Sequence, residues 1–232
     1  MRVLIMVLHA NCPPWDRLAE DGIRGTWWGV DEPGVQSIFY QGGGAETALR
    51  GDVLDVGIPE HPHMMGYKNL IAFKYALWHF EFDYVFRVNS SSYVNKGALL
   101  RFLADKPRTG YYAGVINGTY ISGAGILMSR DVLEKIDANG RSLMHGPPPD
   151  EPPWVPEPED VYLGWLVKSL GVEFSEGRRY NVFEEDRGPA LLPVPGLREE
   201  YHIRCKNSRN RSEDVRAMKE VHKNLLELKN DL

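Results

Sequence analysis

Two patterns of apolar residues alternate along this chain: short continuous runs, and longer stretches with helical spacing. Short β-branched and apolar runs, such as Arg2–His9 and Phe82–Val88, are typical of strands that are buried on both faces of a sheet. Between Tyr67 and Phe80 the apolar residues instead recur every three or four positions, which is typical of an amphipathic helix. Strands and helices that alternate in this way predict an α/β domain.

The same pattern extends over most of the chain. Further strands are predicted at Val35–Tyr40, Asp52–Val56, Tyr111–Ile116, Ile126–Ser129 and Val172–Phe174. Further helices are predicted at Arg17–Trp28 with Asp16 as its N-cap, Ala45–Arg50, Lys96–Leu103, Arg130–Ile136, Asp160–Leu170 and Ser212–Leu228. Because the alternation is clear early and mixed later, we expect one Rossmann-like mixed sheet, flanked by helices, with an antiparallel part.

The composition is that of an ordinary soluble globular protein. Of the 232 residues, 43% are hydrophobic and 25% are charged, and this length suits one large α/β domain better than two small ones. The net charge of −5 argues against broad electrostatic capture of nucleic acid, although a local basic patch is compatible with it. We therefore expect a single domain over residues 1–232.

The amino terminus and the two cysteines add little chemistry. Cys12 and Cys205 form no zinc pattern, and their spacing leaves open whether they pair. The apolar start lacks a small-residue cleavage site and is followed at once by Pro13 and Pro14, which favours a buried strand over a signal peptide. No stretch approaches the roughly 20 apolar residues of a membrane span. We expect a cytoplasmic protein, or a fragment of a longer one.

Four small polar residues interrupt a buried strand near the middle of the chain. Phe86–Asn95 reads Phe-Arg-Val-Asn-Ser-Ser-Ser-Tyr-Val-Asn, so the apolar run ends in Asn89, Ser90, Ser91 and Ser92 before it resumes. Side chains that leave the carboxyl ends of strands meet in the ligand-binding crevice of α/β proteins. We therefore expect this segment to lie at a site.

The segment resembles the metal-binding strand of the Fringe and β-1,3-galactosyltransferase family, which typically reads Lys-Thr-Asp-Asp-Asp-Val-Phe-Val-Asn. In an ungapped comparison, Arg87 takes the place of the lysine, and Asn89, Ser90 and Ser91 take the places of the three aspartates. Asn95 matches the closing asparagine. The frame of the motif is retained, but its carboxylates are absent.

Four other segments resemble motifs of the same family, in the same order. The first is Ile23–Trp27, which matches Ile-Arg-x-Thr-Trp, and the second is Tyr67–Trp78, which includes Asn69, Leu70 and Lys74. The third is Tyr120–Gly125, followed by Ser129-Arg130-Asp131. The fourth is Pro158–Gly164, which contains Glu-Asp-Val-Tyr-x-Gly, and His202 and Cys205 lie beyond it. The resemblance spans about residues 23–205. It implies a GT-A-type fold in which a nucleotide-sugar half, about 1–105, joins an acceptor half, about 106–205, ahead of the C-terminal helix 212–228.

The resemblance also implies how such a site works, and here the chain departs from the pattern. In the family, an aspartate of the motif and a late histidine hold Mn²⁺ or Mg²⁺ on the donor diphosphate, because hard divalent cations prefer carboxylate oxygens. Asn89 and Ser91 offer only neutral ligands, so His202 loses its carboxylate partner. We favour a metal-independent site that uses a nucleoside-diphosphate-sugar donor and no further cofactor. A metal held through water and the nucleotide is the less favoured alternative.

In a metal-independent site, cationic side chains would stabilise the diphosphate directly. The candidate cations are Arg87, Lys74, Arg204 and Lys206, and Arg24 either reaches the nucleotide or forms a salt bridge. The full set of candidate donor-binding residues is Arg24, Lys74, Arg87, Asn89, Ser90, Ser91, His202 and Arg204. The basic cluster of Arg204, Lys206, Arg209 and Arg211 is explained either by a solvated tail or by a phosphate-binding patch.

The acceptor side of the site is expected around Asp160. Spacing alone favours Glu159 and Asp160 as caps of the helix that follows. The family resemblance reverses this preference, because in that family the acid is the base that activates the acceptor hydroxyl. Gly123 and Gly125 either let backbone approach a sugar or form a plain turn before the next strand. Trp154, in the proline-rich segment 146–158 that we expect to be a loop beside the site, would stack on a sugar or base. The candidate acceptor-binding residues are Gly123, Gly125, Trp154 and Glu159.

The function favoured by these observations is inverting transfer of a hexose or pentose from a nucleoside-diphosphate sugar to an acceptor hydroxyl. The acceptor would be a glycan, a small molecule or DNA. A catalytically silent sugar-nucleotide or glycan-binding module is the main alternative, and a viral-type transferase that glycosylates DNA bases is a further one.

Overall fold

The core of the protein is an eight-stranded mixed sheet. The computed structural model describes residues 1–144, 158–184, 188, 190–192 and 196–230. The strands lie in the order β3-β4-β2-β1-β5-β8-β7-β9. Their bounds are β1 Val3–Leu8, β2 Val35–Gln41, β3 Ala48–Arg50, β4 Val53–Asp55, β5 Tyr84–Asn89, β7 Tyr112–Asn117, β8 Tyr120–Ser129 and β9 Phe174–Glu176.

The parallel strands β2, β1 and β5 all end at one edge of this sheet. Strand β1 pairs in parallel with β2 and with β5, so that Leu8 lies between Tyr40 and Asn89. Strand β8 is antiparallel to β5, and its Gly125 lies opposite Val88. The amino-terminal half of β8 therefore lies beside the carboxyl ends of β1 and β5, at the edge where α/β proteins bind ligands.

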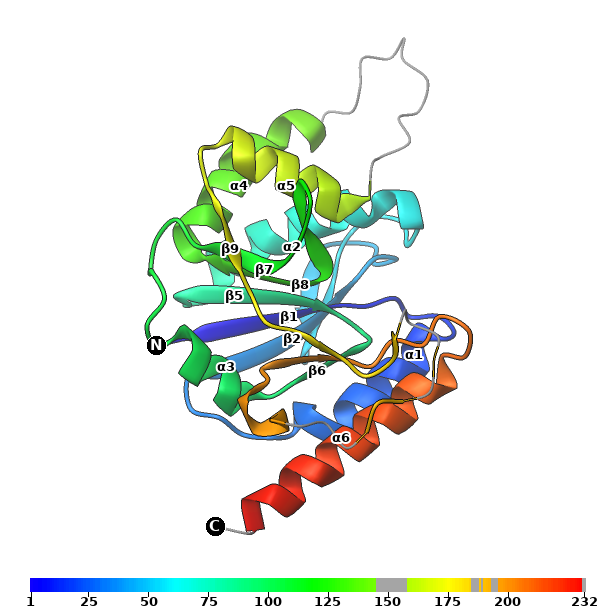
Figure 1. Ribbon diagram of the computed structural model, residues 1–232. Coiled ribbons are helices and arrows are strands. Elements are labelled where there is room, and N and C mark those ends of the chain that lie inside the picture. Colours follow the sequence, from blue (N-terminus) through cyan, green and yellow to red (C-terminus); the bar gives the residue numbers. More distant parts are fainter. Residues whose placement is uncertain (145–157, 185–187, 189, 193–195, 231–232) are drawn as a thin grey trace.

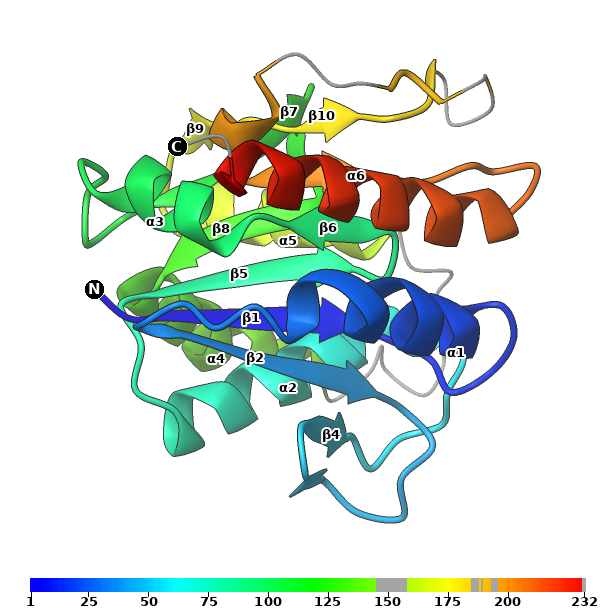
Figure 2. The same cartoon turned by 90° about the horizontal axis from the view of Figure 1, so that it is seen from below.

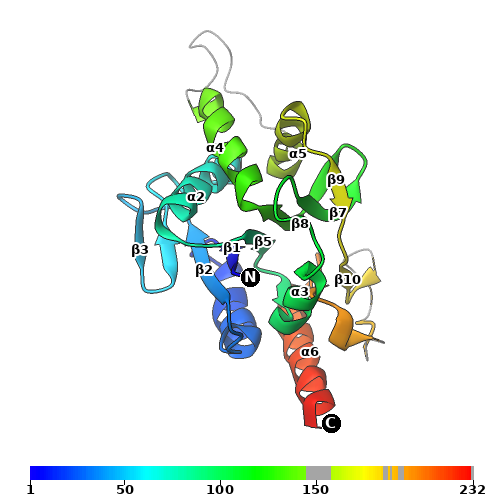
Figure 3. The ribbon, with the colours of Figure 1, turned by 90° about the vertical axis from the view of Figure 1, so that its left-hand side faces the viewer.

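Helices cover both faces of the sheet, as Figures 1 and 3 show. One face carries α2 Met65–His79, α4 Arg130–Met144 and α5 Glu159–Ser169. The opposite face carries η1 Leu18–Trp28, a π-type helix that continues α1 Trp15–Arg17, together with α3 Lys96–Leu103 and α6 Ser212–Asn230. Figure 2 shows η1 and α6 side by side beneath β1 and β5. Short 3₁₀ turns lie at η2 Pro62–Met64 and η4 Leu197–Glu199.

Burial on two faces explains the continuous apolar strands. Leu4, Met6 and Val85 point into the core beneath α2, α4 and α5, whereas Ile5 and Phe86 point into the core that contains Trp27 of η1. Successive side chains of a strand point to opposite faces, so a strand with helices on both sides must be apolar throughout. The prediction of a Rossmann-like mixed sheet is confirmed.

A small second sheet lies next to the end of β5. It has the order β10-β11-β6, with bounds β6 Ser92–Val94, β10 Tyr180–Asn181 and β11 His202–Arg204. The antiparallel pairing of β11 with β6 places His202 opposite Val94 and Arg204 opposite Ser92. The chain thus passes from β5 into the second sheet through the polar segment Asn89–Ser91.

The structure corrects two local predictions. Ala45–Arg50 was expected to be a helix, but Ala48–Arg50 forms strand β3, whose Leu49 pairs with Leu54 of β4. Gly51, with φ +63°, closes this hairpin, and the hairpin overrides the local helix preference of the segment. Asp16 does not cap its helix through its side chain, because Pro14 is the N-cap and the Asp16 carboxylate accepts the Arg17 amide.

Other elements extend further than expected, and the cysteines do not pair. Strand β8 begins at Tyr120, six residues before the predicted start, because the end of β7 pairs with it there, Asn117 with Tyr120. Cys12 is exposed and Cys205 is buried, and both are free thiols. Within the described residues, no helix has the length and apolar character needed to cross a membrane.

Candidate active site

Asp160 lies where the amino terminus of α5 meets strand β8. Its Oδ2 accepts a hydrogen bond of 2.7 Å from the backbone N–H of Gly123, and its Oδ1 accepts one of 3.0 Å from the N–H of Val161. Helix α5 can approach β8 this closely because Gly164 packs directly on Tyr120. The half-buried carboxylate is therefore held in one orientation at the carboxyl edge of the sheet.

A fully buried arginine lies directly behind this carboxylate. Arg87 on the central strand β5 donates to the Tyr40 hydroxyl at 3.1 Å, to Glu159 Oε1 at 2.7 Å and to the Gly123 carbonyl. Burial disfavours a charged guanidinium, but Tyr40 and Glu159 outweigh it and raise the pKa of Arg87. Arg87 and Asp160 thus hold the carbonyl and the N–H of the same residue, Gly123.

The network continues into helix α2. Tyr40 donates to Asn69 Oδ1 at 2.6 Å, so two residues of the sheet and one of α2 are joined by buried hydrogen bonds. Glu159 has a side chain that is only 13% exposed and faces Arg87. We therefore expect Glu159 to hold the start of α5 in place rather than to contact an acceptor, and Arg87 to act behind the crevice rather than in it.

Gly123 and Gly125 lie within strand β8. The alternative prediction, that they form a turn before that strand, is wrong. A Cβ atom on Gly123 would lie 3.0 Å from Asp160 Oδ2 and 3.1 Å from Arg87 Nη1. A Cβ atom on Gly125 would lie 2.4 Å from Cε1 of the His202 ring. Both positions therefore exclude a side chain because protein groups already fill the space.

The polar segment after β5 is internally hydrogen-bonded. Asn89 Oδ1 accepts bonds of 3.1 Å from the Ser91 N–H and from the Ser92 hydroxyl. Ser90 donates to the Leu8 carbonyl at 2.8 Å, which ties the segment to the end of β1. Ser91 accepts a bond of 2.7 Å from Nη2 of Arg211. Asn89, Ser90 and Ser91, which the family resemblance aligns with the three aspartates, thus form an ordered, hydrogen-bonded segment.

His202 is turned into the protein. It is 2% exposed, its Nε2 lies 2.9 Å from the Ser92 hydroxyl, and its ring packs edge-on against Phe86. Burial, followed by the positive charges of Arg179 and Arg204, holds the pKa of His202 well below its usual value. The imidazole is therefore neutral at pH 7.

These donors do not fit a divalent cation of the kind that the family resemblance implies. Mn²⁺ and Mg²⁺ prefer carboxylate oxygens, whereas this edge offers an amide, hydroxyls and an imidazole that already bond to one another. In the part of the chain that the structure describes, no group of three or more His, Cys, Asp or Glu side chains could hold a metal ion.

Two of the predicted cations lie away from Asp160. Arg24 forms a two-pronged salt bridge with Asp52 at 2.6 and 2.7 Å, so the salt-bridge reading of this residue is confirmed. The hydrogen bonds from Arg24 hold the pKa of Asp52 below its usual value. Lys74 lies over the exposed ring of Trp78, 4.8 Å from its centroid.

The lysine that does reach the edge of the sheet is Lys68, which sequence reasoning missed. Its Nζ is buried and bonds to Glu60 Oε1 at 2.6 Å and to the His9 carbonyl at 3.0 Å. Burial lowers the pKa of Lys68, and Glu60 offsets part of that effect. The sequence feature that could have indicated Lys68 is its position next to Asn69, in the first turn of α2.

Arg179 and Arg211 were also not among the predicted site residues. Arg179 Nη1 donates to the Ser122 hydroxyl at 2.9 Å, and Arg211 bonds to Ser91. Arg211 belongs to the basic cluster that the sequence showed, but nothing in its spacing pointed to Ser91. Trp154 lies outside the described residues.

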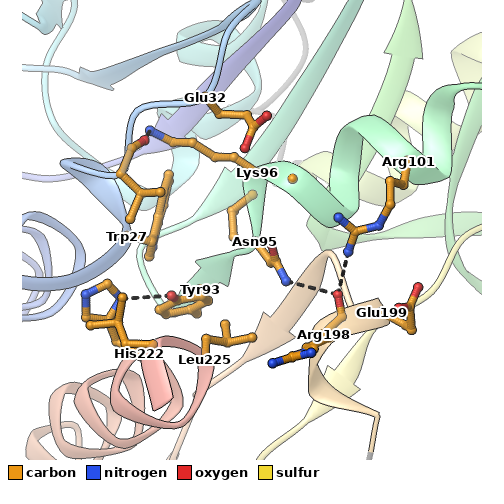
Figure 4. Close-up of a pocket in the computed structure, with 14 residues that line it drawn as sticks. Trp27, Glu32, Tyr93, Asn95, Lys96, Arg101, Arg198, Glu199, His222 and Leu225 are labelled. Carbon is orange, nitrogen blue, oxygen red and sulfur yellow. Dashed lines mark hydrogen bonds between the residues drawn. The ribbon is translucent and has the colours of Figure 1, made fainter. Parts of the chain in front are cut away.

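A separate hollow of about 360 Å³ lies on the opposite face, between η1, α3 and α6 (Figure 4). Its lining includes Trp27, Tyr93 and Lys96, and none of the residues around Asp160. The Tyr93 hydroxyl lies 2.9 Å from Nδ1 of His222, and Lys96 donates to the carbonyls of Trp28 and Val30. These contacts hold α6 and α3 in place.

The fold is similar to that of known glycosyltransferases. A glycosyltransferase involved in the glycosylation of the major capsid of the virus PBCV-1 matches with a TM-score of 0.57 and 13% identity, over 94% of this chain and 99% of that one. GlyE of Streptococcus pneumoniae (TM-score 0.48, 13% identity, 77% and 45% covered) and a mannosyltransferase of Pyrobaculum calidifontis (0.45, 12%, 76% and 54%) are more distant. Only the first match is strong enough to bear on the fold.

The match shows that the chain has the mixed α/β fold of GT-A glycosyltransferases. No protein-family model matches the sequence, and no curated protein does. The narrower resemblance to the Fringe and β-1,3-galactosyltransferase family therefore stays a prediction.

Proposed function

We propose that this protein is an inverting glycosyltransferase that moves a sugar from a nucleoside-diphosphate donor to an acceptor hydroxyl. The observation that carries the proposal is the carboxylate of Asp160, held by the Gly123 N–H at the carboxyl edge of a GT-A fold. A carboxylate in this place can accept a proton from a hydroxyl that approaches from the crevice.

The step would run as a single displacement. Asp160 takes the proton of the acceptor hydroxyl while the acceptor oxygen forms a bond to the anomeric carbon of the donor. The bond from that carbon to the diphosphate oxygen breaks on the opposite face, and its electron pair leaves with the diphosphate. Attack from one face and departure from the other inverts the anomeric centre. Arg87 and Glu159 would fix the Gly123 strand that orients the base.

The proposal includes transfer that does not require a divalent metal. Its support is the donor set at the end of β5, where neutral groups bond to one another in place of the carboxylates. Positive side chains would then stabilise the leaving diphosphate.

The acceptor is proposed to be a glycan rather than DNA. The net charge of −5 disfavours broad contact with a polyanion, and the structurally similar PBCV-1 protein is involved in glycosylation of a capsid protein. DNA binding that weakens steeply with salt would instead support the transferase that modifies bases.

The test is the substitution Asp160→Asn, assayed for sugar transfer and for donor hydrolysis. Removal of a general base lowers the rate by roughly 10²–10⁴-fold. Asp131→Asn is a matched control, since Asp131 is also the second residue of its helix and also accepts the N–H of a glycine, Gly110. Equal loss in both variants would mean damage to the fold.

A silent binding module would give another pattern. Such a protein would bind nucleotide sugars without turnover under any metal condition, and Asp160→Asn would leave that binding unchanged. That outcome would overturn the enzyme proposal.

A further inference from the structure

Three arginines lie near the serines Ser91, Ser92 and Ser122. Arg211 donates to Ser91 at 2.7 Å, and Arg179 donates to Ser122 at 2.9 Å. Arg204 lies opposite Ser92 in the register of β11 and β6. These contacts lie close together, because the Ser92 hydroxyl oxygen also lies 3.2 Å from the carbonyl oxygen of Ala124 on β8, two residues from Ser122.

Arg211 is fixed in place before any ligand arrives. Its Nη2 forms a salt bridge of 3.1 Å with the buried carboxylate of Asp214, and its guanidinium lies over the ring of Trp15, 4.8 Å from the centroid. The side chain is 17% exposed, so it remains partly accessible. A guanidinium that is already ordered loses little entropy when it binds an anion.

The charge at this edge is therefore the reverse of that expected for a metal site. A metal site has carboxylates that hold a cation, whereas here the Ser91 hydroxyl lies against the guanidinium of Arg211, whose ion-pair partner Asp214 is fully buried. The positive charges of Arg179 and Arg204 also help to lower the pKa of the buried His202. Guanidinium groups match the oxygens of a diphosphate in geometry and in charge.

We propose that Arg211, together with Arg179 and Arg204, binds the diphosphate of the donor beside Ser91. This inference rests on the proposed function and deepens it, since it assigns to Arg211 the role that a divalent cation would have on the leaving group. Of the four cations that the sequence analysis proposed for the diphosphate, this set includes Arg204 alone.

The experiment is calorimetric titration of the full chain with inorganic pyrophosphate, UDP and GDP in excess EDTA. The wild-type protein should bind pyrophosphate, and Arg211→Gln should weaken binding roughly tenfold or more, which corresponds to the loss of a charge-assisted contact of about 1.4 kcal/mol. Arg216→Gln is the matched control, because Arg216 lies on α6, which Arg211 directly precedes, and its side chain is 62% exposed and bonded to Glu213. It should bind as the wild type does.

A second variant keeps the inference falsifiable if Arg211→Gln does not fold. Ser91→Asp would put a carboxylate against Arg211, so it should weaken pyrophosphate binding in EDTA and make binding depend on added Mn²⁺. Unchanged affinity in both variants, or wild-type binding that requires Mn²⁺, would overturn the inference.

The outcomes separate this inference from the proposed function. Loss of transfer in Asp160→Asn, together with normal pyrophosphate binding in Arg211→Gln, would refute the arginine site and support the proposed enzyme. Pyrophosphate binding that depends on Arg211, in a protein that transfers no sugar, would support the arginine site and refute the proposed enzyme.

Discussion

The two sides of the candidate site differ in the number of carboxylates that they carry. On the side of β8 and α5, Glu159 and Asp160 are both present, and the pair is organised by the buried Arg87. On the side of β6 and β11, the positions that the family resemblance aligns with carboxylates hold Asn89, Ser90 and Ser91, and Arg211 bonds to Ser91.

The difference fits the two needs of the proposed reaction. Proton removal from an acceptor hydroxyl needs a base such as a carboxylate, whereas a leaving diphosphate needs positive charge, which a metal or a guanidinium can supply. We propose that Asp160 meets the first need and that Arg211 meets the second in place of a metal.

The largest effect on stability is expected at the buried Arg87. Arg87→Met would leave the carboxylate of Glu159 buried without its partner, so the free energy of unfolding should fall by about 3–5 kcal/mol. Urea denaturation measures this loss. The double variant Arg87→Met with Glu159→Leu removes both charges and should recover part of the stability. A loss below about 1 kcal/mol in the single variant would contradict the buried network.

The arginine side should show a pH dependence that comes from Asp214. Burial raises the pKa of this carboxyl from its ordinary 3.8 to about 6. The folded state thus binds a proton that the unfolded state has lost, and stability falls as the pH rises from about 4 to about 6. The fall should amount to roughly 3 kcal/mol, since one pKa unit corresponds to about 1.4 kcal/mol.

Unfolding measured from pH 4 to pH 7 checks this prediction. Asp214→Asn cannot titrate and should flatten the profile over that interval. A wild-type protein that gains stability between pH 4 and pH 6 relative to the variant would show the opposite sign and refute the raised pKa.

The two glycines of β8 should separate stability from activity. Gly125→Ala would press a methyl group into the His202 ring, at 2.4 Å, and should destabilise the fold by about 1–3 kcal/mol. Gly123→Ala meets Asp160 and Arg87 at 3.0–3.1 Å, so it should cost less stability but displace the base. Thermal unfolding and transfer assays of the two variants should therefore rank them in opposite orders. The same order in both assays would contradict the placement of the base.

The smallest effect is expected at Lys74. Its contact is the exposed ring of Trp78, and Lys74→Met should change stability by no more than about 0.5–1 kcal/mol and leave transfer unchanged. Lys68→Met is its counterpart on the same helix and should cost more, about 1.5–3 kcal/mol, because it breaks buried bonds to Glu60 and His9. A loss of transfer in Lys74→Met would restore Lys74 as a site residue.

The fold could be predicted well from the sequence where local and tertiary preferences agree. The apolar strands β1 and β5 and the helix α3 lie within a residue or two of their predicted bounds. The prediction failed at Ala48–Arg50, where the hairpin closed by Gly51 decides the conformation. Pairing partners of this kind are not visible in a single sequence.

The candidate site was predicted in part. The sequence motifs assigned Arg87 to the donor and Gly123 and Asp160 to the acceptor side, and in the structure Arg87 and Asp160 both bond to Gly123. The contact between Ser91 and Arg211 joins residues 120 positions apart, and no local pattern could reveal it. The burial of His202 was equally hidden, because it depends on the room that Gly125 leaves for its ring.

The most direct test of metal-free transfer is a panel of nucleotide sugars offered to the wild-type protein with excess EDTA and with Mn²⁺. Release of nucleoside diphosphate is measured with and without simple glycan acceptors. The account predicts that at least one donor is turned over in EDTA, that Mn²⁺ adds little to that rate, and that Asp160→Asn abolishes it. Turnover that appears only with Mn²⁺ would contradict the account.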